Sequence, residues 1–273
     1  MAEMIDSLQF SPEILAKKPT SGLDVETTLS HFAILTYLVE VEDLRPHIHQ
    51  RFELDCITLP NDSRKALVSV VPFLDLDFRL AQFPWLKWTF AQTNYRAYVT
   101  DMETGEHVVW FFGTSLDSWT VNIPRWAWQL PWHRASIHFD TQYDNQQQVY
   151  TNYQMVTHSQ WAGANLELSD TGRPPKQLLG FPNLESGLVL LTHPLRGYFY
   201  RRDGKLGSYS IWHDQLQPTE GHVKEANFPL LHRLGLVEES DLSAIHSVLI
   251  QPKTDFTIYL PPVRVLDKYD NVT

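Results

Sequence analysis

One arginine lies in the middle of a stretch that alternates like a β-strand. In residues 93–100 the two-residue period of a strand places Asn94 and Tyr98 on the same face as Arg96. If that face points inward, the guanidinium needs an anion, and its planar fork matches a ligand carboxylate. The alternatives are a carboxylate of the protein itself or an outward-facing Arg96, since buried charges are usually paired internally.

A second group of candidates lies in the stretch QLPWHRA, residues 129–135. An ordinary histidine titrates near pH 6.5, which suits His133 to the role of a general base or hydrogen-bond donor. A lone histidine is more often a satisfied structural residue. Arg134 is the alternative cation for a pocket, because consecutive residues of an extended chain point to opposite sides.

Aromatic residues are concentrated in the same region, with seven of the nine tryptophans between residues 85 and 132. They are either the walls of a ligand cavity or ordinary core. We assign Trp132 to the cavity because of its position in the turn at residues 129–135, and Trp110 and Phe112 to its walls. The catalytic candidate is therefore His133, and the ligand-binding candidates are Arg96, Asn94, Tyr98, Trp132, Arg134, Trp110 and Phe112.

Motifs for other chemistry are absent. The 12 histidines include no His-Glu-x-x-His pattern, and there is no nucleophile elbow, Walker loop or dinucleotide fingerprint. A zinc site gathered from distant positions, for instance His133, His193 and His213, remains a minor alternative. We expect no metal and no cofactor. The pair Asp75 and Asp77 lies in a loop-like stretch and is expected to be solvated.

Most segments that must position these residues have the pattern of strands. A β-branched run covers residues 66–73, and a turn at residues 101–106 joins residues 93–100 to 107–114 as a hairpin. Asp203-Gly204 favours a second hairpin. Residues 255–260 alternate as a half-buried strand that Pro261-Pro262 should end.

Helical segments are few and short. Residues 42–49, 118–128, 184–192 and 228–234 are candidates, and Pro46 and Pro124 interrupt the first two. We predict a β-dominated α+β fold, a curled sheet or barrel with a few short peripheral helices. Residues 1–28 are expected to form an N-terminal arm and residues 29–273 a single domain, because no later linker is long enough to separate two.

Charge and cysteine content limit the partners. With 22 basic and 32 acidic residues the formal charge is -10, and no basic run exceeds a dipeptide, which argues against nucleic acid and anionic membrane. No apolar stretch approaches the length of a membrane span, and the N-terminus does not resemble a secretory signal. Cys56 is the only cysteine, so we expect no internal disulfide and a cytoplasmic location.

The stretch 129–135 resembles the Gly-Phe-Pro-Lys-Lys-Leu-Ala turn of acetoacetate decarboxylases. Pro131 and Ala135 match, while Trp132 and His133 stand where that family has its lysine pair. From about residue 33 to 265, the order of the segments resembles the YqjF-like family of unknown function, within the acetoacetate-decarboxylase-like superfamily. The matching segments are LTYLV (35–39), VSVVPF (68–73), NYRAYV (94–99), VWFF (109–112), LPWHRA (130–135), QLQP (215–218) and IYLPP (258–262).

The resemblance implies a double β-sheet enclosing one pocket and a tendency to form homo-oligomers. In the decarboxylases one lysine of the pair forms a Schiff base with the substrate, and this chain has no lysine there. The strand carboxylate of those enzymes is missing too, because Asn94-Tyr95-Arg96 stands near its position. An enzyme of this kind would be lyase- or decarboxylase-like without the lysine route.

Two functions therefore stay open. The first is an enzyme-like domain for a small organic acid or carbonyl compound, with a carboxylate at Arg96 and His133 beside it. The second is a non-catalytic carrier or sensor with the same pocket, as expected of an enzyme that has lost its lysines. A domain with a solid core, used for protein interactions, would have no ligand-sized cavity.

Overall fold

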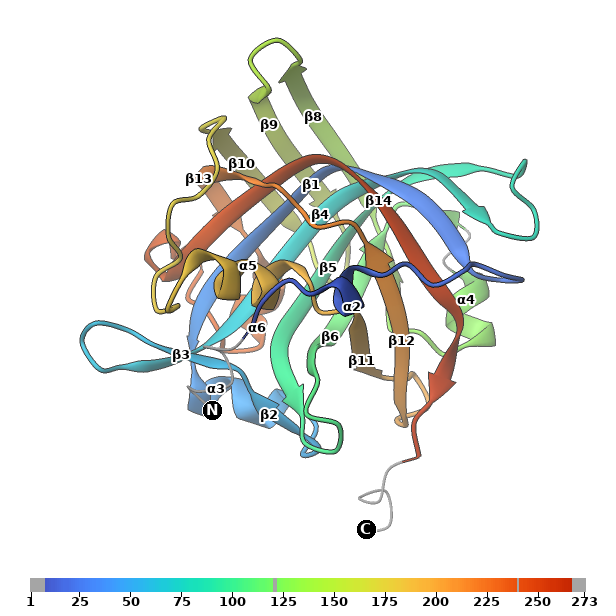
Figure 1. The fold of residues 1–273 in the computed structure, drawn as a ribbon, viewed down its shortest axis with the longest axis horizontal. Coiled ribbons are helices and arrows are strands. Elements are labelled where there is room, and N and C mark those ends of the chain that lie inside the picture. Colours follow the sequence, from blue (N-terminus) through green and yellow to red (C-terminus); the bar gives the residue numbers. More distant parts are fainter. Residues whose placement is uncertain (1–7, 120–121, 240, 267–273) are drawn as a thin grey trace.

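The computed structural model describes residues 8–119, 122–239 and 241–266, and most of them lie in β-strands (Figure 1). Seven strands close into a barrel, because β14 pairs with β12 on one side and with β1 on the other. In pairing order they are β1 (Val25–Glu40), β4 (Arg64–Leu80), β5 (Trp88–Asp101), β6 (His107–Leu116), β11 (Arg196–Tyr200), β12 (Leu206–His213) and β14 (Ile245–Arg264).

A second layer of strands continues from the barrel. β14 also pairs with β13 (Thr219–Asn227), and the sheet runs on through β10 (Ala164–Asp170), β9 (Val149–His158) and β8 (Ser136–Asp144). In Figure 1 the strands β8–β10 lie behind the barrel. One hydrophobic core lies between the two layers and includes Tyr95 and Tyr153. A second core lies inside the barrel and includes Phe32 and Tyr98.

The remaining elements are short. Three small strands pair at the barrel, namely β2 (Phe52–Leu54), β3 (Cys56–Thr58) and β7 (Trp132–Arg134). The helices are α2 (Pro12–Leu15), α3 (Val41–Leu44), η1 (Arg45–His47), α4 (Asn122–Ala127), α5 (Leu184–Thr192), α6 (Pro229–Arg233) and η3 (Leu242–Ala244). Helix α5 begins where Asn183 Oδ1 accepts a hydrogen bond from the backbone of Ser186 (2.8 Å), and it packs Leu190 and Leu191 into the barrel core.

The predicted fold class is confirmed, since a large curled sheet is accompanied by a few short helices. Both predicted hairpins form, and α5 has the predicted bounds. One strand end was predicted wrongly, because β14 continues through Pro261-Pro262 to Arg264. A register shift opposite Ser208 and Ser210 accommodates the prolines there, so that Val263 still pairs with β12.

Residues 8–24, which precede β1, lie on the chain's own barrel, and residues 25–28 of the predicted arm already belong to β1. The indole nitrogen of Trp212 on β12 donates to the Leu15 carbonyl (2.9 Å), and His193 Nε2 contacts the Ile14 carbonyl (3.1 Å). Farther along, the Tyr259 hydroxyl on β14 donates to the Lys18 carbonyl (3.0 Å). In Figure 1 the arm crosses in front of β12 and β14. None of the helices in the described ranges is long and apolar enough to cross a membrane.

The close packing of β11 against β6 predicts that added side-chain volume at Gly197 destabilises the barrel. Gly197 pairs with Val109 on β6, and a methyl group there would overlap the ring of Phe111. We expect Gly197→Ala to lower the free energy of unfolding by about 1–3 kcal/mol, measured by urea denaturation. Gly163→Ala is the matched control, because its Cβ would lie 3.5 Å from the nearest atom. Equal stability of the two variants would contradict this account of the wall.

Candidate functional site

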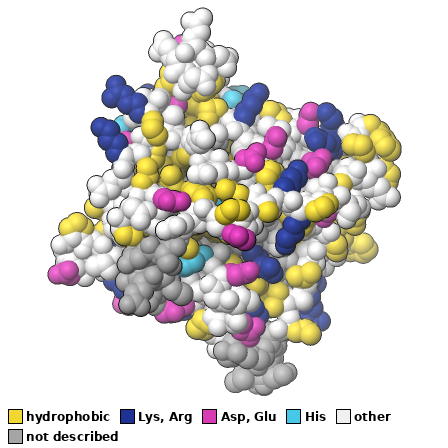
Figure 2. All heavy atoms as spheres, in the orientation of Figure 1, with side chains coloured by type: hydrophobic (Ala, Val, Ile, Leu, Met, Phe, Trp, Pro, Cys, Tyr) yellow, Lys and Arg dark blue, Asp and Glu magenta, His cyan; other side chains and the backbone are white. Residues whose placement is uncertain are grey.

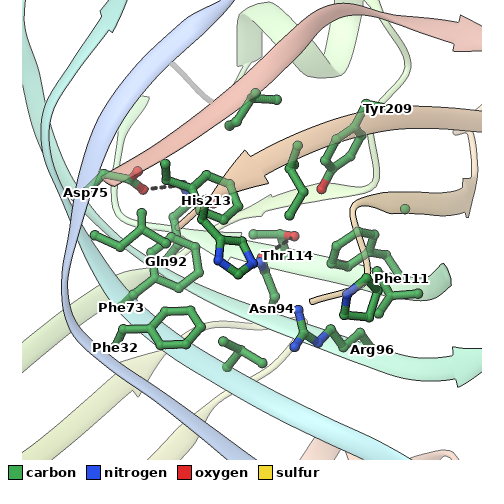
Figure 3. Close-up of a pocket in the computed structure, with 18 of the residues that line it drawn as sticks. Phe32, Phe73, Asp75, Gln92, Asn94, Arg96, Phe111, Thr114, Tyr209 and His213 are labelled. Atoms are coloured by element: carbon green, nitrogen blue, oxygen red, sulfur yellow. Dashed lines mark hydrogen bonds between the residues drawn. The ribbon is translucent and has the colours of Figure 1, made fainter. Parts of the chain in front are cut away.

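A cavity of about 60 Å³ lies inside the barrel (Figure 3). One enclosed water takes roughly 10–15 Å³ of such space, so the cavity has room for about four to six waters or an organic molecule of similar size. Most of its wall is apolar, including Phe32, Phe73, Phe111 and Phe256. The polar side chains that face it include Asp75, Gln92, Asn94, Arg96, Thr114, Arg196, Tyr209 and His213.

Arg96 brings a positive charge into this cavity from β5. The residue is only 7% exposed, and its Nη2 donates to the Leu191 carbonyl (2.9 Å) and to the Tyr98 hydroxyl (3.3 Å). The buried Nε has no hydrogen-bond partner. Within the described parts of the chain, no carboxylate forms an ion pair with Arg96. Its charge is therefore not neutralised by the protein.

A second buried arginine shows how this barrel handles such a charge elsewhere. Arg51 is 5% exposed, and its Nε and Nη2 donate to the two oxygens of Asp101 at 2.8 and 2.7 Å. Asp101 also accepts from the Tyr198 hydroxyl, and the guanidinium holds the pKa of this carboxyl below its usual value against the effect of burial. Arg196, at the edge of the cavity, pairs with Glu106 (3.1 Å). Unlike Arg51 and Arg196, Arg96 has no carboxylate partner among the described residues.

The residues beside Arg96 on the same face of β5 are neutral and polar. Asn94 Oδ1 accepts from the Thr114 hydroxyl (2.8 Å), which leaves the amide nitrogen as the end available to a ligand. Gln92 follows one step farther along β5, and its Nε2 donates to Asp75 Oδ2. Figure 3 shows Asp75 and Gln92 at one side of the cavity and Arg96 at the other, with Asn94 and His213 between them.

Asp75 is a carboxyl group without a cation. It is 1% exposed, and burial raises its pKa to about 7 although the Gln92 amide donates to it and the Thr27 hydroxyl lies 3.0 Å from Oδ1. The expectation that Asp75 and Asp77 are solvated is therefore wrong for Asp75. It holds for Asp77, which is exposed and pairs with the exposed Lys87 (2.7 Å), because the register shift between Asp75 and Phe78, with Asp77 at a φ of 55°, interrupts the alternation. Asp75 is buried because β4 extends to Leu80, beyond the predicted strand, and alternation turns it inward.

His213 lies at the end of β12 and is 3% exposed. Burial first, and then the charges of His193 and Arg96, lower its pKa to about 4, so that the imidazole is neutral at neutral pH. Its Nδ1 lies 2.7 Å from the Asp214 carbonyl, which places the proton on Nδ1. The ring stacks on Phe256 and meets His193 edge-on, with centroids 4.6 Å apart.

The structure brings together some of the predicted ligand-binding residues. Arg96, Asn94 and Trp132 line the cavity. Tyr98 shares their face of β5 but lies beneath the surface of the cavity, where it donates to the Leu191 carbonyl (3.0 Å) and contacts Ser69 Oγ (2.8 Å).

Four other predicted residues do not line the cavity. Trp110 and Phe112 point into the core between the two layers, while Val109 and Phe111 face the cavity. His133 lies on the opposite face of β7 from Trp132 and stacks on Trp161, with centroids 4.0 Å apart and nearly parallel rings. Burial, followed by the charges of Arg125 and Arg202, lowers the pKa of His133 to about 4. The fourth, Arg134, is exposed.

The cavity also contains polar residues that the sequence did not single out, chiefly Asp75, Gln92, Tyr209 and His213. The two-residue period that relates Arg96 to Asn94 also leads to Gln92, so this residue could have been predicted from the sequence. No local sequence pattern predicts that His213 lines the cavity, because closure of the barrel through β12 and β14 places it there. His193 is next to His213, whereas His133 stacks elsewhere, and no group of three or more metal-ligating side chains occurs in the described ranges.

Comparison with known proteins agrees with this architecture. The sequence model of a family described as an uncharacterised conserved protein matches residues 26–255. No curated protein matches this chain. Among solved structures, acetoacetate decarboxylase from Legionella pneumophila is 13% identical with a TM-score of 0.57, and the alignment covers 97% of this chain and 96% of that one.

Two further structures share the fold. An acetoacetate decarboxylase-like enzyme from Sphingomonas wittichii RW1 is 9% identical with a TM-score of 0.55, covering 90% of this chain and 95% of its own. The enduracididine biosynthesis enzyme MppR, solved with pyruvate, is 9% identical with a TM-score of 0.54, covering 93% and 94%. The TM-scores show a common fold despite the low identities, and the acetoacetate-decarboxylase-like fold predicted from the sequence is confirmed.

Proposed function

The chain belongs to the DUF2071 family of uncharacterised conserved proteins, and we propose that its barrel cavity binds a small organic acid or carbonyl compound. The carboxylate of the ligand pairs with Arg96, and Asn94 and Trp132 line the same space. The size of the cavity suits a molecule of a few heavy atoms. This cavity also favours a ligand-binding role over an interaction domain with a solid core.

The observation that carries the proposal is the unneutralised guanidinium. An isolated charge loses several kcal/mol of hydration on burial unless an anion or a full set of hydrogen bonds replaces water. Arg51 has that anion in Asp101, while Arg96 has carbonyl and hydroxyl partners and an unpaired Nε. A bidentate carboxylate ligand would supply what the protein leaves out. The pyruvate in the MppR structure is an anion of the expected size on the same fold.

We further propose that any reaction here proceeds without a Schiff base. None of the cavity-lining residues in the described ranges is a lysine. Lys87, the one lysine in an aromatic stretch of sequence, is exposed and pairs with Asp77. An imine-forming lysine instead needs a desolvated or charge-crowded setting that lowers its pKa. The candidates are thus a lyase- or decarboxylase-like enzyme that uses other groups, or a carrier or sensor that retains its ligand.

The surface adds little that suggests a macromolecular partner. On the face shown in Figure 2, Lys and Arg side chains are interspersed with Asp and Glu rather than gathered into one basic patch. Nucleic acid would require such a patch along its phosphates.

We place the protein in the cytoplasm, where its single buried thiol, Cys56, would remain reduced.

A ligand screen tests this function. We expect short oxo and hydroxy acids to raise the melting temperature, with a stabilisation of about 2.7 kcal/mol when the ligand is at 100 times its dissociation constant. Thermal shift with pyruvate, acetoacetate and 3-hydroxybutyrate is the measurement. Chromatography of the mixture after incubation distinguishes an enzyme, which converts the acid, from a carrier, which returns it unchanged. Absence of stabilisation by every carboxylate and carbonyl compound would count against the proposal.

A further inference from the structure

The cavity has two chemically different ends. Gln92, Asn94 and Arg96 follow one another on the same face of β5, so the first and the last are about 13 Å apart along the strand. The cation lies at the Arg96 end. At the other end, Asp75 from β4 meets the amide of Gln92, as the dashed line in Figure 3 shows. A ligand held by its carboxylate at Arg96 would extend toward this second end.

The hydrogen bonds around Asp75 fit a protonated carboxyl group. The Thr27 hydroxyl lies 3.0 Å from Asp75 Oδ1 and 3.1 Å from the Leu76 carbonyl, but it has one proton to donate. If Asp75 is the acid, its Oδ1–H donates to Thr27, and Thr27 donates to the Leu76 carbonyl. Gln92 Nε2 donates to Oδ2. Every polar atom of the group is then satisfied, whereas an ionised Asp75 leaves Thr27 to satisfy two acceptors with one proton.

The surroundings of Asp75 provide no charge to offset ionisation. No cation forms an ion pair with it in the described ranges, and burial raises its pKa to about 7. The titratable groups that face the cavity from the other strands are Arg96 on β5, Arg196 on β11, and Tyr209 and His213 on β12. His213 is already neutral, and burial raises the pKa of Tyr209 far from the neutral range. Near neutral pH, Asp75 is the group among these that changes charge.

We propose that Gln92, positioned by the acid form of Asp75, binds a second, uncharged oxygen of the ligand. One hydrogen of the Gln92 amide goes to Asp75, and the other is free to donate to a carbonyl or hydroxyl oxygen. This inference rests on the proposed function, because Arg96 must hold the carboxylate. The site then selects monocarboxylic acids whose carbonyl or hydroxyl group is several bonds away from the carboxylate. It rejects dicarboxylates, since the second end offers no cation.

Ionisation of Asp75 gives this selectivity a pH dependence. Above pH 7 a negative charge appears in the enclosed cavity that also holds the anionic ligand. Binding then requires Asp75 to take up a proton, and affinity falls up to tenfold for each pH unit above its pKa. Asp75→Asn keeps a neutral side chain of the same shape, so it should bind the ligand equally well at low and high pH.

Calorimetric titration of the full chain with 4-oxopentanoate, pentanoate and glutarate tests the inference at pH 6.0 and 8.5. We expect 4-oxopentanoate to bind about tenfold more tightly than pentanoate at pH 6.0, as one added hydrogen bond implies, and glutarate not to bind. Gln92→Met should lower the affinity for 4-oxopentanoate to that for pentanoate and leave pentanoate unchanged. The affinity for 4-oxopentanoate should fall at least about tenfold at pH 8.5 in the wild type but not in Asp75→Asn.

The outcomes separate this inference from the function on which it rests. Equal binding of 4-oxopentanoate and pentanoate, lost together in Arg96→Met and unaffected by Gln92→Met, would overturn the second anchor and retain the carboxylate site. Tight binding of glutarate would have the same meaning. If no carboxylate binds to the wild type at either pH, both the function and the inference fail. Melting temperatures of the variants confirm that a lost signal does not come from unfolding.

Discussion

Replacing Arg96 with methionine is expected to abolish carboxylate binding and to leave the ligand-free protein at least as stable as the wild type. Hydrogen bonds to a charged group contribute about 1.5–3 kcal/mol each, so loss of a bidentate contact should weaken binding at least about 100-fold. Stability should not suffer, because the variant no longer buries an unpaired charge. The Tyr98 hydroxyl still donates to the Leu191 carbonyl, which therefore keeps a donor.

Isothermal titration and urea denaturation of the same preparations measure both halves of this expectation. The free energy of unfolding of Arg96→Met should be unchanged or higher by up to about 2 kcal/mol. Arg134→Met is the matched control, since Arg134 is exposed and does not line the cavity, and it should bind ligand like the wild type. Undiminished binding in Arg96→Met, or binding lost equally in the control, would exclude the assigned role.

Replacing Asp75 with asparagine should change how stability depends on pH. The pKa of Asp75 is about 7 in the folded protein and near 3.8 when unfolded, so the folded state holds the proton more tightly. Its contribution to stability is fully present below pH 4 and is lost as the pH rises through 7. A difference of about 3 pH units corresponds to about 4 kcal/mol. As the pH rises from 5 to 8, the free energy of unfolding of Asp75→Asn should therefore increase by about 3 kcal/mol relative to that of the wild type.

Buried histidines change stability with pH in the opposite direction to Asp75. The quantity to measure is therefore the difference in free energy of unfolding between the wild type and Asp75→Asn. The pKa values of His133 and His213 are lowered to about 4, so their contribution rises between pH 4 and 6.5 in both proteins and cancels. Urea denaturation at pH 5, 6, 7 and 8 gives the difference. Asp77→Asn is the control, because Asp77 is exposed two residues away. Parallel pH profiles for wild type and Asp75→Asn would show that Asp75 ionises normally.

Local pattern predicted the part of the site that lies along a single strand. The period of two placed Asn94 and Tyr98 on the face of Arg96, and Asn94 and Arg96 do line the cavity. The same period extends to Gln92, which the prediction did not include. Turn and cap residues had similar local effects, since Asp203-Gly204 joins β11 to β12 and Asn183 begins α5. The order of the segments also identified the fold, because the family pattern extends over nearly the whole barrel.

Tertiary structure decided which face of each strand meets the cavity. Both faces of β6 are buried, one in the barrel and one against the second layer, so hydrophobicity gave no reason to prefer Phe111 over Trp110 or Phe112. A register shift opposite Arg96 also breaks the correspondence between β5 and β6. An error of one residue then moves a side chain to the other core.

The same physical reason explains the other differences. Trp132 and His133 are neighbours, yet one faces the cavity and the other stacks on Trp161. Asp75 became a buried acid because β4 continues farther than its β-branched run, and His213 reached the site because β14 closes the barrel against β12 and β1. The sequence by itself determined the fold and the alternation of each strand. Only closure and layering of the sheet decided which of the two buried faces surrounds the ligand cavity.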